Sequence, residues 1–122
     1  MSGRKITMDA ITDGSVTGTG TATHFAVVDE GNAKILHSQA LSSSQGVTSG
    51  NTFTLTAQAV AFPDPASGAI HDDVLDAACS YISANADKMY ILSADPGLTW
   101  ANIASYALGS KASPSFTGPA DN

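Results

Sequence analysis

The sequence predicts a mainly β protein, a compact antiparallel β-sandwich or barrel with one amphipathic helix packed on it. The first half of the chain alternates between apolar and polar side chains, which is the pattern of half-buried strands. After the segment 62–69, which holds two prolines, the apolar residues change to helical spacing. Thr, Ser, Gly and Ala are abundant and only 13% of the residues are charged, which suits closely packed β surfaces. A length of 122 residues fits one domain, residues 1–122.

The expected strands before the prolines are 5–10, 19–29, 34–41 and 51–62. In the first of these strands, Ile6 and Met8 point to one side and Thr7 to the other. The second half of 19–29 is apolar on both faces, which favours a central strand. The last strand has the clearest alternation, and its apolar face would consist of Phe53, Leu55, Ala57, Ala59 and Ala61.

Turn chemistry separates these strands. Thr12-Asp13-Gly14-Ser15 is typical of a turn, because its glycine can adopt a positive φ angle. Glu30-Gly31-Asn32 predicts a hairpin turn, and residues 42–50 predict a polar loop. Four strands joined by short connections would form an antiparallel meander.

Residues 70–84 predict the amphipathic helix. The stripe expected to face the sheet is Ile70, Val74, Ala77, Ala78, Tyr81 and Ile82. Asp72, Asp73 and Asp76 lie in the first turns, where the helix dipole favours negative charge. The elements expected beyond the helix are a strand at 88–93, a short helical turn at 98–104, weaker extended pieces at 106–108 and 115–117, and a loop-like ending at 118–122.

The charge of the chain excludes several classes of partner. The formal net charge is −6, and the five cations are scattered, so that no basic patch for nucleic acid can form. Attraction to an anionic membrane surface is equally disfavoured. No apolar run is long enough to span a bilayer, and the first residues lack a signal-peptide core. We therefore expect a soluble protein made inside a cell, with neither nucleic acid nor membrane as a partner.

Cys79 is the only cysteine, which excludes an intrachain disulfide. A buried thiol on the helix is the favoured interpretation, because free cysteines are among the most buried side chains. A single thiol also fits production in a reducing cytoplasm.

No motif in the sequence supports an enzyme. Gly14 to Gly20 superficially resembles a phosphate-binding loop, but it leads into a β pattern and no helix follows. His71-Asp72-Asp73 could suggest a metal site, yet adjacent helical positions diverge by about 100° each, so that a charged helix start is the better interpretation. The chain has no nucleophile elbow around a serine. We expect no catalytic residue, no cofactor and no metal ion.

Two histidines and four aromatic residues remain as candidates for an interface or a ligand surface. His24 and His37 lie on neighbouring expected strands and could approach each other, although two histidines without a third ligand do not make a metal site. Trp100, Tyr90, Tyr106 and Phe116 could form a platform for a sugar ring. The favoured alternative is that they fill the second half of a small core.

Several segments together resemble small virion proteins of tailed bacteriophages. The segments that carry the resemblance are Met89-Tyr90-Ile91-Leu92-Ser93-Ala94-Asp95-Pro96-Gly97, Tyr106-Ala107-Leu108-Gly109-Ser110-Lys111, Arg4-Lys5-Ile6, Gly20-Thr21-Ala22-Thr23-His24-Phe25-Ala26-Val27-Val28-Asp29 and Val47-Thr48-Ser49-Gly50-Asn51-Thr52-Phe53-Thr54-Leu55. They cover most of the chain, and their motifs are moderately specific.

The order of these segments differs from that of the phage proteins, in which the helix comes first. Reading residues 69–122 and then residues 2–65 restores the order. The chain therefore resembles a circular permutant, with Met1 as the start residue and Ala66-Ser67-Gly68 as a joint that looks engineered; natural variation in gene order is the alternative. We expect Ala66, Ser67 and Gly68 to be exposed, and Met1 and Asn122 to lie close together.

The resemblance implies a non-enzymatic virion component, either head-decoration or tail-associated, that assembles with copies of itself and with other virion proteins. Its location would be the virion, assembled in the host bacterial cytoplasm, and the permuted chain would be a recombinant cytoplasmic protein serving as an assembly or display scaffold. The alternative is a β module that binds a carbohydrate or a receptor through the region around Trp100 and Tyr106. A hydrolase would require a histidine within hydrogen-bond reach of a serine in a cleft.

Overall fold

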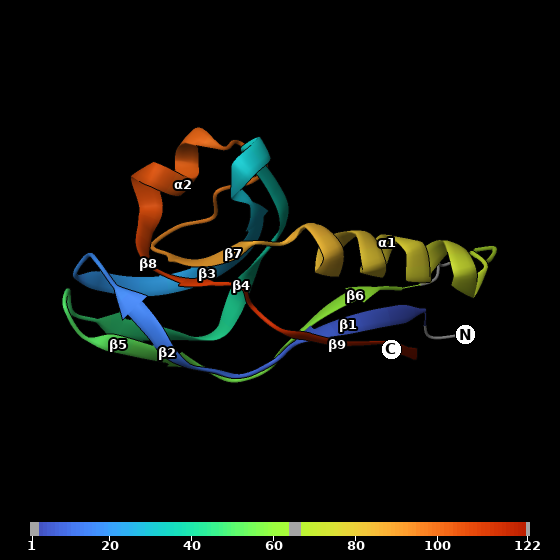
Figure 1. Ribbon diagram of the computed structural model, residues 1–122, viewed down its shortest axis with the longest axis horizontal. Helices are drawn as coiled ribbons and strands as arrows, with labels where there is room; N and C mark the ends of the chain where they lie inside the picture. Colours follow the sequence, from blue (N-terminus) through green and yellow to red (C-terminus); the bar gives the residue numbers. More distant parts are fainter. Residues whose placement is uncertain (1–2, 64–66, 122) are drawn as a thin grey trace.

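The computed structural model describes residues 3–63 and 67–121, which form a mainly antiparallel β structure with few helices (Figure 1). The strands are β1 (Arg4–Met8), β2 (Ile11–Val16), β3 (Gly20–Asp29), β4 (Lys34–Val47), β5 (Thr52–Leu55), β6 (Gln58–Phe62), β7 (Lys88–Leu92), β8 (Ala107–Ala112) and β9 (Phe116–Asp121). The helices are α1 (Asp72–Asn85) and α2 (Ala101–Tyr106), and the 3-10 turn η1 (Glu30–Asn32) joins β3 to β4. The expected fold class is confirmed.

The strands form two antiparallel sheets that curl into a half-barrel. Their orders are β6-β1-β9 and β4-β3-β7-β8-β2-β5. The expected meander is wrong, because β3 and β4 are the only successive pair of the four expected strands that lie side by side. β1 pairs instead with β6 and β9, which come from distant parts of the chain. Turn residues specify local hairpins, whereas these long-range pairs depend on apolar faces that meet only in the folded molecule.

Three long ribbons of chain run through both sheets. β1 continues into β2, β5 into β6, and β8 into β9, with a bend of two or three residues in each case. The central ribbon, β1–β2, has β6 and β5 on one side and β9 and β8 on the other. At the bend, the Asp9 amide donates a hydrogen bond to the Ser115 carbonyl at 2.8 Å. The two sheets are therefore continuous with each other.

The strand expected at 51–62 is interrupted, and the interruption changes which residues face inward. Thr56 and Ala57 separate β5 from β6, and the side-chain Nε2 of Gln58 donates a hydrogen bond to the Thr56 carbonyl at 2.9 Å. This break shifts the alternation by one residue. The inward positions are Phe53, Leu55, Gln58, Val60 and Phe62, so that Ala57, Ala59 and Ala61 face solvent, contrary to expectation.

Two segments expected as connections belong to strands. Residues 12–15 lie within β2, where the expected turn is wrong. A ring atom of Phe53 lies 2.1 Å from the position that a Cβ atom of Gly14 would occupy, so that the glycine is required for close packing and not for a turn. The polar loop expected at 42–50 is also wrong for residues 42–47, which belong to β4. The strand continues to Val47 past a bulge at 41–44.

The other expected elements agree more closely with the structure. β1 buries Ile6 and Met8, and β3 lies between β4 and β7 with residues 25–29 buried, as a central strand should. The expected helical turn corresponds to α2, shifted toward the C-terminus. The loop-like ending is wrong, because β9 extends to Asp121 and pairs with β1.

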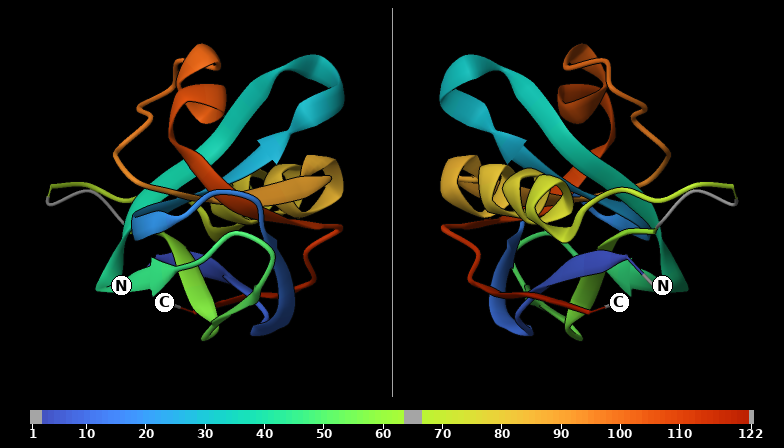
Figure 2. Two further views of the ribbon diagram at one scale, coloured as in Figure 1. Left: turned by 90° about the vertical axis from the view of Figure 1, so that its left-hand side faces the viewer. Right: turned by 90° about the vertical axis from the view of Figure 1, so that its right-hand side faces the viewer.

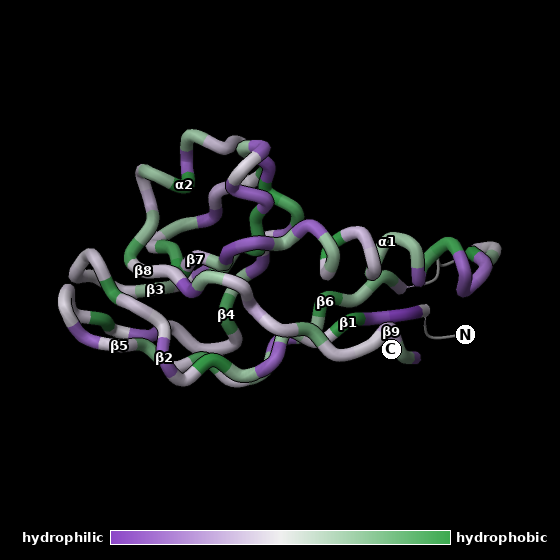
Figure 3. The backbone as a smooth tube through the Cα atoms, viewed as in Figure 1, coloured by the Kyte–Doolittle hydropathy of each residue, from purple (hydrophilic) through white to green (hydrophobic). Residues whose placement is uncertain are grey.

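Three apolar clusters make up the core. The largest lies within the curled sheet around Phe25, Val27 and Met89. The second lies beneath α1 and includes Ile6 and Val60. The third lies beneath α2 at the opposite end of the molecule (Figure 1). Figure 3 shows apolar positions recurring along β1, β6 and α1, where the second cluster forms.

α1 packs on the sheet through a different stripe from the one expected. Leu75, Cys79 and Ile82 are buried, whereas Val74 and Tyr81 are 61% and 50% exposed. Of the expected stripe, only Ile82 belongs to the buried face. The helix carries apolar residues on two adjacent stripes, so that its periodicity did not determine which stripe the sheet would bury.

The segment that leads into α1 projects outward in Figure 2. Ser67 and Gly68 are exposed, as expected for a joint, and Gly68 has a φ of +96° with no other atom near the place of a Cβ. Ala66, Met1 and Asn122 lie outside the described residues, so that the expectations on these three positions stay predictions.

Candidate interaction surface

Three of the candidate aromatic residues gather at one end of the molecule. Trp100, Tyr106 and Tyr90 pack against the third core cluster, beside Ile103 of α2 and Leu92 of β7. Each is only partly buried. Phe116 lies elsewhere, against the first and second clusters. The rings therefore contribute to the core, as the favoured alternative predicted, while part of each remains accessible.

The hydroxyl of Tyr90 is engaged by the turn between β3 and β4. It donates a hydrogen bond to the Glu30 carboxylate, and the Lys88 ammonium lies 3.5 Å from the same carboxylate and 5.3 Å from the centre of the Tyr90 ring. Burial, the hydrogen bond to Glu30 and the negative charges of Glu30 and Asp87 raise the pKa of Tyr90 to about 12. This polar cluster fixes the orientation of the Tyr90 side chain.

Asp87 fixes the turn itself. Its carboxylate accepts hydrogen bonds from the amides of Glu30 at 2.7 Å and Gly31 at 3.3 Å. The turn ends at Ala33, which adopts a left-handed conformation with a φ of +56°. The expected hairpin is confirmed, and the carboxylate of Asp87, which directly precedes the neighbouring strand β7, stabilises it.

His24 and His37 do not approach each other, because their side chains are on opposite faces of the sheet. In the register of β3 and β4, His24 is opposite Ala40, and His37 is opposite Val27. The Nδ1 atom of His24 lies 2.9 Å from the Thr23 hydroxyl, whereas the Nε2 atom of His37 lies 2.7 Å from the Gln39 Oε1 atom. The idea that the two rings meet is wrong, since both are occupied locally.

The loop before α2 exposes a large apolar residue. Leu98 is 78% exposed, and it follows Gly97, whose amide donates to the Asp95 carboxylate at 2.8 Å. The Ser38 hydroxyl donates to the Gly97 carbonyl at 3.3 Å, which places this loop beside β4. Leu98 was not among the candidates, because a turn composition gives no indication of which apolar side chain will point outward.

One flank of α1 is apolar and exposed. Val74 and Tyr81 point to solvent on the same side, with Ala77 and Ala78 between them, and Ile70 precedes them with 37% exposure. The helix has no charged side chain from Ala77 to Asn85. Sequence reasoning identified this stripe and assigned it to the core. An exposed helix flank without charge is unusual for a surface that meets only water.

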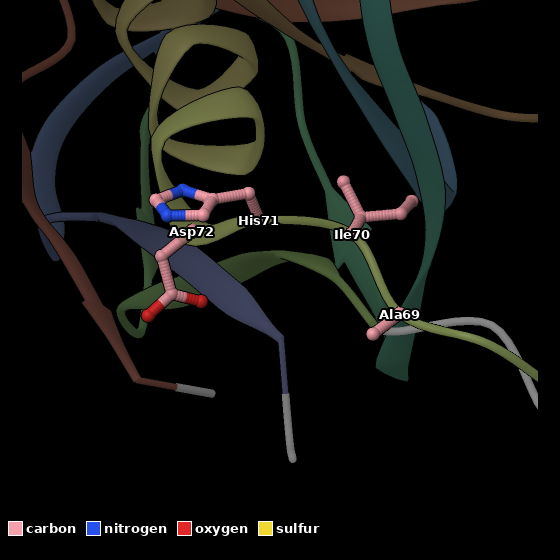
Figure 4. Close-up of a pocket in the computed structure, with 4 residues that line it drawn as sticks. All are labelled: Ala69, Ile70, His71 and Asp72. Atoms are coloured by element: carbon pink, nitrogen blue, oxygen red, sulfur yellow. The ribbon is translucent and has the colours of Figure 1, made fainter.

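The N-terminal end of α1 shows a charged helix start, as expected. The His71 Nδ1 atom accepts a hydrogen bond from the Asp73 amide at 3.0 Å, and Asp72 and Asp73 occupy the first turn. Ala69, Ile70, His71 and Asp72 line an open hollow of about 460 Å³ (Figure 4). Within residues 3–63 and 67–121, no three His, Cys, Asp or Glu side chains gather into a possible metal site.

Arg4 connects α1 with two strands. Its guanidinium donates to Asp76 of α1 at 2.7 Å and to Asp121 of β9 at 2.8 Å. These hydrogen bonds raise the pKa of Arg4 above its ordinary value. Beneath the same helix, Cys79 is fully buried, and its burial raises the pKa of the thiol.

Comparison with protein-family models, with curated proteins and with solved structures gave no match for this chain. In the part of the chain that the structure describes, neither helix combines the length and the apolar character that a bilayer crossing demands.

Proposed function

We propose that this protein is a non-enzymatic structural component of a tailed-bacteriophage virion, head-decoration or tail-associated, that works by subunit assembly. The observation that carries the proposal is the exposure of Val74, Tyr81 and Leu98 on a protein with few surface charges. Large exposed apolar side chains are typical of surfaces that another protein covers. The resemblance to phage virion proteins supplies the class of assembly.

The permuted order of the segments is part of this proposal. Arg4 of β1 is the register partner of Asp121 of β9, so that a short hairpin loop could join β9 to β1. Ser67 and Gly68 are exposed, which suits a joint between two former termini. In this view the chain is an engineered scaffold for assembly or display, derived from a virion protein.

Size-exclusion chromatography with light scattering, over a wide range of protein concentration, tests the assembly. We expect a homo-oligomer whose population grows with concentration, and electron microscopy of the concentrated sample should show particles of uniform size. A strict monomer at the highest concentration would contradict the proposed function.

A second candidate is a β module that binds a carbohydrate or a receptor. Its supporting observation is that Leu98 is exposed two residues before the partly accessible Trp100. A glycan array tests it, with Trp100→Ala as the matched variant. Under this second candidate function, the wild-type protein binds at least one glycan on the array and Trp100→Ala does not. An array on which the wild-type protein binds no glycan would exclude carbohydrate binding.

A further inference from the structure

We propose that the exposed flank of α1, defined as Val74, Ala77, Ala78 and Tyr81, is the surface through which two copies of this chain associate, and that the two helices cross antiparallel. This inference rests on the proposed function, because it names the contact through which assembly begins. The occupant of the flank is therefore the same flank of a second copy.

The first argument is that the fold does not need this flank. Leu75, Cys79 and Ile82 already fix α1 on the second core cluster, and Arg4 fixes Asp76 from the side of β1. The apolar flank is an additional stripe that burial in the monomer does not explain. Covering Val74 and Tyr81 would remove apolar surface from water, which is favourable in proportion to the area covered.

The second argument is that the flank is complementary to itself. Val74 and Tyr81 are seven residues apart, close to two helical turns, so that they lie on one side of the helix. The midpoint between them falls between Ala77 and Ala78. In an antiparallel pair centred there, Val74 of one copy faces Tyr81 of the other, and the small alanines allow the backbones to approach at the centre.

The third argument concerns charge. Each chain carries a net charge of −6, so that two copies repel each other over most of their surfaces. The helix has no charged side chain from Ala77 to Asn85, and its acidic residues are concentrated in the first turns. An antiparallel pair places the acidic first turn of each copy near the C-terminal end of the other helix, where the next charged residues, Asp87 and Lys88, have opposite signs. A parallel pair would bring Asp72 and Asp73 of both copies together, which favours the antiparallel arrangement.

The size of the contact sets its strength. A helix of 14 residues is roughly 21 Å long, and a contact of that length lies at the lower end of specific interfaces, below about 1,200 Å². The pair should therefore be weak and dependent on concentration. Weak contacts of this kind become effective when many copies are held together, since each further contact is then intramolecular.

Charge-exchange variants test both the surface and its direction. Val74→Lys alone and Tyr81→Glu alone should each weaken dimerisation by about tenfold or more in sedimentation equilibrium, because each change occurs twice in a symmetric pair. The double variant should recover the dimer, since Lys at position 74 of one copy then faces Glu at position 81 of the other. Thr48→Lys, a change at an exposed residue in the turn after β4 and away from the flank, should leave dimerisation unchanged and serves as the control.

Cysteine cross-linking gives an independent readout. Ala77→Cys should form an intermolecular disulfide under mild oxidation, whereas Ser83→Cys, on another side of the helix, should not. Circular dichroism establishes that each variant is folded, which is expected because the substituted positions are exposed or partly exposed.

The outcomes separate this inference from the proposed function. A wild-type oligomer that none of the α1 variants weakens would overturn the inference and leave assembly intact. A double variant weaker than either single variant would overturn the antiparallel arrangement. A wild-type protein that is monomeric at every concentration would overturn the inference and the proposed function together.

Discussion

Arg4 and Asp121, which are 117 positions apart in the chain, are register partners in neighbouring antiparallel strands and are joined by an ion pair of 2.8 Å. Arg4 also holds Asp76 of α1, so that a single guanidinium joins three elements. The first and last described strands are therefore antiparallel neighbours, as the two strands of a hairpin are.

The first prediction is that the chain folds equally well in the rearranged order, with residues 67–122 followed by residues 2–66 behind an initiating Met. Arg4 and Asp121 would then flank a short hairpin loop, which antiparallel partners accept readily. Far- and near-ultraviolet circular dichroism should match those of the present chain, and thermal unfolding should have a similar midpoint. Loss of the near-ultraviolet signal in the rearranged chain would contradict the prediction.

The second prediction distinguishes the two faces of α1. Leu75→Ala should lower the free energy of unfolding by about 2–5 kcal/mol, because the side chain is buried against the sheet. Val74→Ala, the neighbouring change on the exposed flank, should cost no more than about 0.5 kcal/mol. Urea denaturation at low protein concentration measures both values. Equal losses would contradict the assignment of Val74 to the exposed flank.

The third prediction concerns the close contact of Gly14 with Phe53. Gly14→Ala should lower the free energy of unfolding by about 1–3 kcal/mol, because the added methyl group would overlap the ring. The control is Gly46→Ala, where no atom lies within 4 Å of the new Cβ and loss of backbone freedom in the unfolded chain favours a small gain. Combining Gly14→Ala with Phe53→Leu should cost less than the sum of the two single changes.

The fourth prediction is a pH dependence that arises from Tyr90. Its pKa is raised from 10.0 to about 12 in the folded protein, so that the folded state holds the phenol proton more tightly than the unfolded state. The resulting stabilisation is complete below pH 10 and is lost as the pH rises toward 12. Tyrosinate absorbance should show a component that titrates near 12 and is missing in Tyr90→Phe. A titration unchanged by this substitution would contradict the assignment.

The elements that sequence reasoning located correctly are those whose pattern is local. β3 and β7 are apolar on both faces, and the structure places them next to each other inside the larger sheet. The hairpin at Glu30-Gly31-Asn32 follows from its own turn residues. In these cases a few adjacent residues carry enough information to specify the conformation.

The predictions that were wrong concern residues whose conformation depends on contacts with distant parts of the chain. The local sequence around Gly14 predicts a turn, but the glycine is required because the Phe53 ring packs against it. The chain bends at Thr56 and Ala57, between β5 and β6, and the alternation shifts there by one residue. Residues of β6 that were expected to face inward therefore face solvent. α1 is joined to β1 by an ion pair between Asp76 and Arg4, which are 72 positions apart in the chain. None of these partners is visible in a local pattern.

The candidate surface shows the same division. The apolar stripe that contains Val74 and Tyr81 was visible in the sequence, but its exposure was not. Trp100, Tyr90 and Tyr106 were identified as candidates, and the structure gathers them around Ile103, where most of their surface packs against the core. Composition identifies residues that can bind, and the fold decides which of them are free to do so.

The ribbons that cross from one sheet to the other have a consequence for how the molecule opens. Because β1–β2, β5–β6 and β8–β9 each belong to both sheets, an opening that displaces one of these ribbons along its whole length disrupts strand pairs in both sheets. The slowest amide protons of the two sheets should therefore exchange with solvent at one common free energy, that of global unfolding. We therefore expect the protein to unfold as one cooperative unit.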